Sequence, residues 1–180
     1  MRDRSNAALL ASAHLGDHEA WRELVRRHLR LVWAVARSFR LSRDDAADVT
    51  QATWLILAEN LTTIRRPDRL TAWLVTTARR ESLAVLRARY REEPADLRLP
   101  DGSPTPEDSA EAADTGTRLW RAYRTLPARC RRLLHLVAHA PDLTYPELAQ
   151  ATGIPTNSLG PTRHRCLTVL RRRLTTEAVR

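Results

Sequence analysis

Residues 144–174 read TYPELAQATGIPTNSLGPTRHRCLTVLRRRL, and they predict two helices joined by a tight turn. Thr144 and Glu147 form a capping box that begins the first helix, and Gly153 ends it. An arginine-rich helix then continues to Leu174. Two helices with a short glycine-containing turn between them are typical of the helix-turn-helix, in which the second helix enters the major groove of DNA.

The second of these helices has an apolar side and a polar side. At helical spacing, the side expected to face the core carries Leu159, Cys166, Leu170 and Leu174. The opposite side presents groups for base edges early and arginine for phosphates late, in the order Gly160, Pro161, His164, Arg165, Thr168 and Arg172. This order favours readout of duplex DNA over a generic solvated helix face. If Ser158 caps the helix, Pro161 falls in the first turn, where proline is tolerated.

Charge divides the 180 residues into three segments. Residues 1–91 carry a net charge of +7 and residues 118–180 a net charge of +9, whereas residues 92–117 between them carry −7. The middle segment has four prolines, two glycines and few large apolar side chains, so it cannot bury enough surface to offset its ordering entropy. The sequence therefore predicts two basic domains joined by a flexible acidic linker.

The N-terminal domain is predicted to be helical as well. Asp17 is a suitable N-cap, and apolar residues at spacings of three and four follow it. Ser42 and Asp45 resemble a capping box for a second helix. A third long helix is predicted from about residue 68 to residue 90. The predicted fold class is therefore all-α, with two small helical domains of which the C-terminal one is a helix-turn-helix.

Arginines gather beside tryptophans around the third helix of the N-terminal domain. The arginines are Arg65, Arg66, Arg69, Arg79, Arg80, Arg87, Arg89 and Arg91, and the tryptophans are Trp54 and Trp73. Basic and aromatic side chains together suit single-stranded nucleic acid, because bases stack on the rings while the cations follow the backbone. A tryptophan at helical spacing is also typical of a core, so the pattern leaves both interpretations open.

The composition limits the partners and the compartment. A net charge of +9 and an isoelectric point near 11.1 favour a polyanionic partner, nucleic acid before an anionic membrane surface. Cys130 and Cys166 are far apart and match no metal-ligand spacing, so the sequence predicts neither a zinc site nor a disulfide. No apolar run approaches the ~18 residues of a membrane span, so we expect a soluble protein in a reducing cytoplasm.

Two stretches of the chain carry a family resemblance. Residues 126–174 closely resemble the fourth conserved region of the extracytoplasmic-function (ECF) sigma factors of bacterial RNA polymerase, through Leu126-Pro127, residues 145–153 and residues 163–165. Residues 44–87 read DDAADVTQATWLIL and then RPDRLTAWLVTTARRESLAVLR, and they resemble the second region, whose pattern is matched in order by Asp48, Gln51, Trp73, Leu74, Ala78 and Arg79. Both stretches in this order, with a linker between them, identify the chain as a member of this family.

The resemblance implies a role for each region. The domain of residues 1–91 would dock on the clamp helices of the largest subunit of core RNA polymerase through Asp45, Asp48, Gln51, Trp54 and Leu55. Its later part would capture the unpaired non-template strand of the minus-ten element through Asn60, Arg65, Arg66, Asp68, Arg69, Trp73, Arg79 and Arg80. The domain of residues 118–180 would contact the polymerase flap and read the duplex minus-thirty-five element through Ser158, Gly160, Pro161, Thr162, Arg163, His164, Arg165, Thr168 and Arg172.

The resemblance also implies that the chain directs transcription initiation, catalyses nothing itself and uses neither a metal nor a cofactor. An anti-sigma protein is a further partner that the family suggests. The acidic segment of residues 92–117 could occupy the nucleic-acid channel of the polymerase as a mimic of RNA, or it could be a solubilising spacer.

The chain departs from the family pattern at positions that matter for promoter choice. Arg80 stands where many members have asparagine, and Ala84 stands where aspartate is usual. Gly160 and Pro161 replace a polar or basic pair early in the recognition helix. Base preference at the minus-ten element is therefore not transferable, and readout at minus-thirty-five would depend on His164 and its neighbours.

Two other classes of protein fit parts of the sequence. A helix-turn-helix regulator that binds duplex DNA unaided explains residues 118–180 but gives the N-terminal domain no role. A zinc enzyme is suggested by two pairs of histidines at i, i+4, His14 with His18 and His135 with His139. Neither pair has the adjacent glutamate of the H-E-x-x-H motif, and no third ligand is evident.

Overall fold

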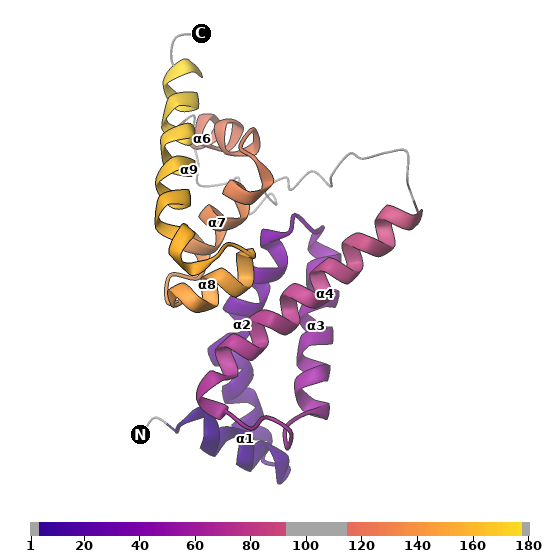
Figure 1. Cartoon of the computed structure of the whole chain (residues 1–180). Helices are drawn as coiled ribbons and strands as arrows, with labels where there is room; N and C mark the ends of the chain where they lie inside the picture. The colour runs from indigo at the N-terminus through magenta and orange to yellow at the C-terminus, as the bar shows by residue number, and fades with distance from the viewer. Residues whose placement is uncertain (1–3, 93–114, 178–180) are drawn as a thin grey trace. The chain divides into compact units, whose positions relative to one another are not determined.

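The computed structural model describes residues 4–92 and 115–177, and all regular secondary structure in these ranges is helical (Figure 1). This confirms the all-α prediction. The chain divides into two compact units, residues 1–100 and 101–180, which we describe separately as unit 1 and unit 2.

Unit 1 is built from four α-helices and one short 3₁₀ turn within its described residues. Their bounds are α1 Asn6–His14, α2 His18–Ser38, α3 Arg43–Glu59, η1 Pro67–Arg69 and α4 Leu70–Glu92. Asp17 caps α2 as predicted, because its Oδ1 accepts from the backbone N–H groups of Glu19 and Ala20 at 3.0 and 3.1 Å. Ser42 caps α3 as predicted, and its Oγ accepts from the Asp45 N–H at 3.1 Å.

Helix α1 is absent from the sequence prediction. Ser5 caps it, with its Oγ accepting from the Ala8 N–H at 3.2 Å, and Leu9 and Leu10 are its buried side chains. Its apolar residues do not form a clear stripe, so helical periodicity gave little signal here. The small serine cap before Asn6 is the feature that could have revealed it.

Helices α2, α3 and α4 of unit 1 pack on one another, and α1 packs on α2. The core is made of fully buried aliphatic side chains on these helices, among them Leu24, Val32, Leu57, Leu70 and Leu74. Each such side chain contributes roughly 2 kcal/mol when it is removed from water. This core holds the exposed faces of α3 and α4 in a fixed relation.

Unit 2 contains the predicted helix-turn-helix. Its described helices are α6 Thr115–Arg124, α7 Ala128–His139, α8 Tyr145–Thr152 and α9 Thr156–Glu177, and α9 packs against the other three (Figure 1). The capping box of α8 is confirmed, because the backbone N–H of Thr144 donates to Glu147 Oε2 at 2.9 Å. Gly153 ends α8 in the left-handed region at φ 72°, which is why a glycine stands there.

The start of α9 differs from the prediction. The helix begins at Thr156 rather than at a Ser158 cap, so Pro161 lies inside the second helical turn. The proline has no N–H to offer the carbonyl of Asn157, so α9 lacks this one intrahelical hydrogen bond. The prediction that Pro161 falls in the first turn is therefore wrong.

The prediction that the two cysteines form no disulfide is also wrong. Cys130, in the first turn of α7, and Cys166, in the middle of α9, form a disulfide whose Cα atoms are 5.3 Å apart. The two residues are 36 positions apart in sequence, and only the packing of α7 on α9 brings them together.

Most of the predicted linker, residues 92–117, lies outside the described residues. At its edges, Glu92 is the last residue of α4, and residues 115–117 are the first of α6. Across residues 4–92 and 115–177, no helix has the length and apolar composition needed to cross a bilayer. The same residues contain no group of three or more histidine, cysteine or acidic side chains that could hold a metal ion.

Candidate nucleic-acid interface

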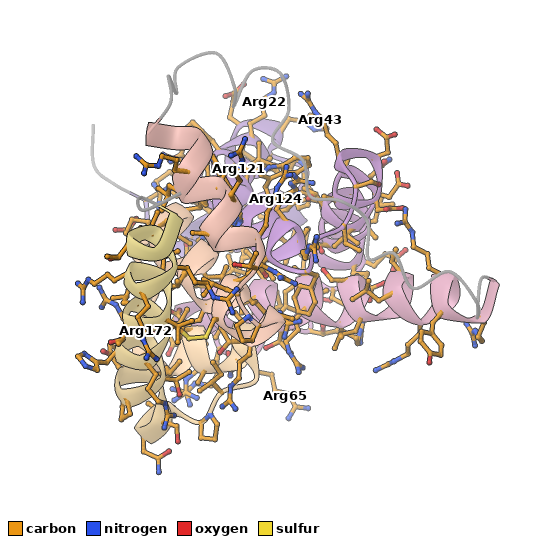
Figure 2. All side chains as sticks on the ribbon, turned by 90° about the horizontal axis from the view of Figure 1, so that it is seen from above. Arg22, Arg43, Arg65, Arg121, Arg124 and Arg172 are labelled. Carbon is orange, nitrogen blue, oxygen red and sulfur yellow. A yellow bond between two sulfur atoms is a disulfide. The ribbon has the colours of Figure 1, made fainter. Side chains whose placement is uncertain are left out.

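Helix α9 carries five of the nine predicted readout residues on the side away from its neighbours. The side chains predicted to face inward do so, with Leu159 and Cys166 buried and Leu170 and Leu174 half-buried. On the opposite side, the exposed residues are Pro161, His164, Arg165, Thr168 and Arg172. Arg163 is exposed as well, but it lies on the side of α9 that faces α7. Figure 2 labels Arg172 among the side chains that project from this helix.

The three remaining predicted readout residues differ from these in exposure. Ser158 and Gly160 are half-buried, and Thr162 is buried at 6% exposure. The Thr162 hydroxyl accepts from Arg165 Nη2 at 3.3 Å. Thr162 therefore holds the guanidinium of Arg165 in place and does not itself face outward.

Gly160 lies at the edge of the exposed face of α9 and is not required by packing. A Cβ atom built on it would meet no atom within 4 Å, and no unusual backbone angle accompanies it. Because Gly160 has no side chain, the backbone of α9 is uncovered beside Pro161, and another backbone could approach it closely there.

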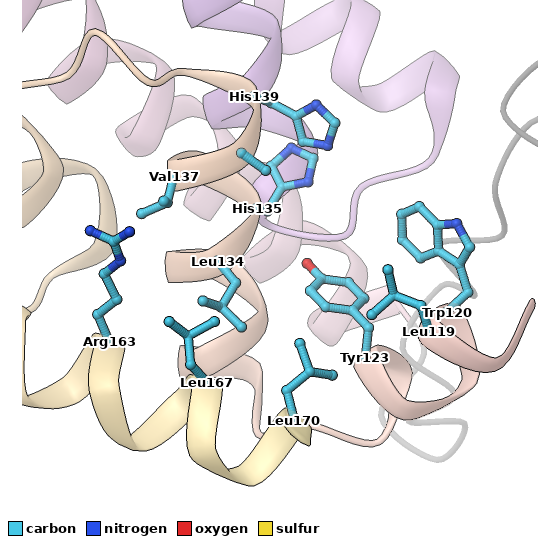
Figure 3. A pocket seen from close by; sticks show the side chains of 11 residues that line it. Leu119, Trp120, Tyr123, Leu134, His135, Val137, His139, Arg163, Leu167 and Leu170 are labelled. Atoms are coloured by element: carbon cyan, nitrogen blue, oxygen red, sulfur yellow. The ribbon is translucent and has the colours of Figure 1, made fainter. Parts of the chain in front are cut away.

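A pocket of about 350 Å³ opens between α6, α7 and α9 of unit 2 (Figure 3). Apolar side chains form most of its wall, and its lining residues are Leu119, Trp120, Tyr123, Leu134, His135, Val137, Ala138, His139, Arg163, Leu167 and Leu170. The rings of His135 and His139 lie 4.4 Å apart at one side of the pocket. Sequence reasoning missed this pocket, because residues from three separate helices form it.

The basic cluster predicted in unit 1 extends from the loop before η1 along the whole of α4, with Arg87, Arg89 and Arg91 in its last turns. Arg65, Arg66 and Arg69 are exposed, and Arg66 Nη2 lies 3.3 Å from Asp68 Oδ2. Along α4, Arg80 is exposed and lies 3.1 Å from Glu81, whereas Trp73 and Arg79 are half-buried. Asn60, the C-cap of α3, is half-buried and donates from Nδ2 to the Ile56 carbonyl at 2.8 Å. The predicted minus-ten residues thus run from the end of α3 through η1 to the middle of α4.

The five residues predicted to bind polymerase are all on α3, but they are not equally accessible. Asp48, Gln51 and Leu55 are exposed, and the exposed fraction of Leu55 is 57%. Asp45 is half-buried and forms an ion pair with Arg89 of α4. Trp54 is 9% exposed and packs edge-on against Trp21 with ring centroids 6.1 Å apart. Its ring therefore supports the α2–α3 packing rather than the outer surface.

Comparison with known proteins identifies the family. Residues 24–92, which cover most of α2 and all of α3 and α4, match the family model for sigma-70 region 2. The chain is 38% identical over 88 residues to the ECF RNA polymerase sigma factor RpoE of Cereibacter sphaeroides, a match that covers 48% of each chain. It is 31% identical over 129 residues to the ECF RNA polymerase sigma factor SigM of Mycobacterium tuberculosis, which covers 72% of this chain and 64% of SigM. The chain belongs to the ECF sigma factors.

A further curated relative carries the same family name. A match to the ECF sigma factor SigE of Mycolicibacterium smegmatis covers 83% of this chain at 29% identity. The chain spans about half of RpoE from C. sphaeroides and 61% of SigE.

Two solved structures share the fold at lower identity. The chain resembles CnrH, solved in complex with the cytosolic domain of CnrY, with a TM-score of 0.63 at 22% identity over 96% of this chain and 99% of CnrH. It resembles RpoE of Bartonella quintana, solved with the anti-sigma factor NepR, with a TM-score of 0.64 at 21% identity over 86% of this chain and 96% of RpoE.

Proposed function

We propose that this ECF sigma factor binds core RNA polymerase and directs it to promoters, and that it catalyses no reaction itself. The observation that carries the proposal is the combination of a region 2 match on unit 1 with a helix-turn-helix in unit 2. A regulator that acts on duplex DNA alone would need only the second of these.

Helix α9 is the proposed reader of the minus-thirty-five duplex. Its exposed side offers His164 and Arg165 in the first half and Arg172 two turns later. Arginine suits both guanine edges in the major groove and phosphate oxygens, so the helix can combine base readout with backbone contacts. The hydrogen bond from Arg165 to the buried Thr162 hydroxyl would orient the guanidinium before DNA arrives.

Unit 1 is the proposed site for the unpaired minus-ten strand. The exposed arginines around η1 would follow the backbone, and Trp73, half-buried at the start of α4, would offer part of its ring for stacking. Unpairing costs a few kcal/mol per extruded base, and stacking returns about 1–3 kcal/mol per base. Because the cost of unpairing and the gain from stacking are similar in size, promoter opening would need the polymerase as well as this protein.

Two surfaces are proposed to bind the polymerase. The exposed Asp48, Gln51 and Leu55 of α3 form a surface with polar and apolar parts that suits the clamp helices. The pocket between α6, α7 and α9 suits the apolar side of a helix, which is the mode we propose for the flap. The buried Trp54 would act by supporting α3.

An anti-sigma protein is a proposed regulator. RpoE of B. quintana was solved with an anti-sigma factor, and this chain shares its fold. Such a partner would compete with the polymerase for the α3 surface or for the unit 2 pocket.

Run-off transcription tests the proposal. Purified chain is added to core RNA polymerase on a library of genomic fragments, and transcripts are mapped at single-nucleotide resolution. We expect discrete new start sites that share two sequence elements upstream, and weak duplex binding by the chain alone. Tight sequence-specific duplex binding without polymerase, and no new start site with it, would instead support a helix-turn-helix regulator.

A further inference from the structure

The disulfide of unit 2 joins the two helices whose packing sets the position of the recognition helix. Cys130 is half-buried near the start of α7, and Cys166 is 1% exposed in the middle of α9. Leu134 and Leu170, one helical turn further along their respective helices, both line the unit 2 pocket. Because residues at i and i+4 share a helix face, the disulfide lies along the same α7–α9 seam as the pocket wall.

The other side of α9 carries the proposed DNA surface. His164 and Arg165 directly precede Cys166 in the sequence and are exposed. The disulfide therefore ties α9 to α7 directly after His164 and Arg165, which belong to the proposed minus-thirty-five contact. No residue of the α2, α3 or α4 helices takes part, because both cysteines of the chain lie in unit 2.

We propose that Cys130 and Cys166 form a redox site whose oxidation state sets how firmly α9 is held on α7. The disulfide form holds the helix-turn-helix in the arrangement described above. The dithiol form releases this restraint and lets α9 separate from α7 more often. The effect of this site on transcription rests on the proposed sigma-factor function, whereas the redox change itself does not.

The proposed reduction is a thiol–disulfide exchange with an external dithiol. A thiolate of the reductant attacks Sγ of Cys130, the more exposed of the two residues, and the Sγ of Cys166 leaves as a thiolate that takes up a proton. The second thiol of the reductant then displaces Cys130, which is also protonated. Two electrons and two protons pass to the protein, and the reductant becomes a disulfide.

The bridge encloses a long stretch of chain, so its loss should be measurable. The bridged residues are 36 positions apart, and all of α8 lies between them. A cross-link of this length removes much of the freedom of the unfolded chain. For a domain of this size we expect reduction to lower the melting temperature of unit 2 by on the order of 10 °C.

Hydrogen exchange on the full-length chain tests the structural part. The protein is equilibrated either with oxidised glutathione or with dithiothreitol, the thiols are alkylated and counted by mass, and amide exchange is followed by mass spectrometry. We expect one disulfide in the first sample and two thiols in the second. We also expect exchange in α7 and α9 to be at least tenfold faster in the reduced sample, with α2–α4 unchanged as an internal control.

A cysteine-free variant, Cys130→Ser with Cys166→Ala, is the matched control. It should exchange like the reduced protein in both buffers, and it should lose all response to redox state. Thiols that stay unpaired in oxidised glutathione, or equal exchange rates of α7 and α9 in the two wild-type samples, would overturn the inference. Neither outcome depends on the variant being stable.

Run-off transcription in the two buffers tests the consequence. With the wild-type chain we expect several-fold less transcript from a promoter with a minus-thirty-five element in the reduced sample, and no difference between buffers for the cysteine-free variant. Equal transcript from both wild-type samples would overturn the link to α9. If neither sample gives a promoter-specific transcript, the sigma-factor function fails, and the exchange data alone decide whether the redox site exists.

Discussion

Arg89, near the C-terminal end of α4, forms an ion pair with Asp45 in the first turn of α3, 44 positions earlier in the sequence. The same Asp45 carboxylate accepts from the Ser42 hydroxyl, and the Asp45 backbone N–H donates to Ser42 Oγ. The cap of α3 and the end of α4 are therefore fixed to one another. This contact orients the side of α3 that carries Asp48 and Gln51.

Replacing Arg89 tests this contact. We expect Arg89→Ala to lower the free energy of unfolding by about 1 kcal/mol, because Asp45 is half-buried and loses a charged donor. Arg87→Ala, at an exposed position on the same helix, should change it by less than about 0.5 kcal/mol. Urea unfolding followed by circular dichroism measures both. Equal losses for the two variants would show that the ion pair contributes nothing.

Leu55 tests the proposed polymerase surface of α3. We expect Leu55→Ala to weaken binding to core RNA polymerase about tenfold, because an interface would bury this exposed side chain. Leu29→Ala removes a similarly exposed leucine from α2 and should leave the affinity unchanged. Fluorescence anisotropy with labelled chain measures both affinities. A loss of the same size for Leu29→Ala would place the contact elsewhere.

Arg165 and Arg172 should affect promoter binding in different ways. We expect Arg165→Ala in the holoenzyme to lower affinity for a minus-thirty-five duplex about tenfold and to reduce discrimination at one base pair. Arg172→Ala should weaken binding to all sequences alike and reduce the slope of log affinity against log salt by about 1, as expected for a lost phosphate contact. Salt titrations on matched and mismatched duplexes distinguish the two. Identical profiles for both variants would argue against the division of α9 into a base-reading and a phosphate-binding half.

The two glycines of the helix-turn-helix should respond in opposite directions to alanine. Gly160→Ala should raise the free energy of unfolding by about 0.5–1 kcal/mol, because the added methyl group meets open space and alanine favours a helix. Gly153→Ala should lower it by about 1 kcal/mol, because φ at this position is 72°. Thermal unfolding measures both. A destabilised Gly160→Ala variant would mean that another contact requires the glycine.

Glu23 makes the stability of unit 1 depend on pH in the acid range. Hydrogen bonds from Arg26 and then Arg27 lower the pKa of Glu23 from 4.5 to about 2, against an opposing effect of desolvation. Since the folded pKa is below the unfolded one, the stabilisation is present above pH 4.5 and is lost as pH falls toward 2. We expect Glu23→Gln to flatten the melting temperature profile in that interval, while Glu59→Gln, at an exposed position, leaves it unchanged. An unaltered profile for Glu23→Gln would contradict this.

Interactions between residues close together in the sequence determined where most of the helices begin and end. The caps Asp17, Ser42 and Thr144 and the αL glycine Gly153 depend on neighbours within a few residues, so they were predicted correctly from the sequence. The two stripes of α9 were predicted for the same reason, because the helical period places each residue once a helix is assumed. The family resemblance of both regions likewise depends on order along the chain.

Packing between segments far apart in the sequence decided the contacts that join different helices. The Cys130–Cys166 disulfide, the Asp45–Arg89 ion pair and the packing of Trp54 against Trp21 each join residues on different helices. The pocket of unit 2 likewise needs three helices at once. Sequence spacing predicts which face a residue occupies but not which other helix that face meets. That partner is set by how whole helices pack, because the energy of each contact is shared among many side chains.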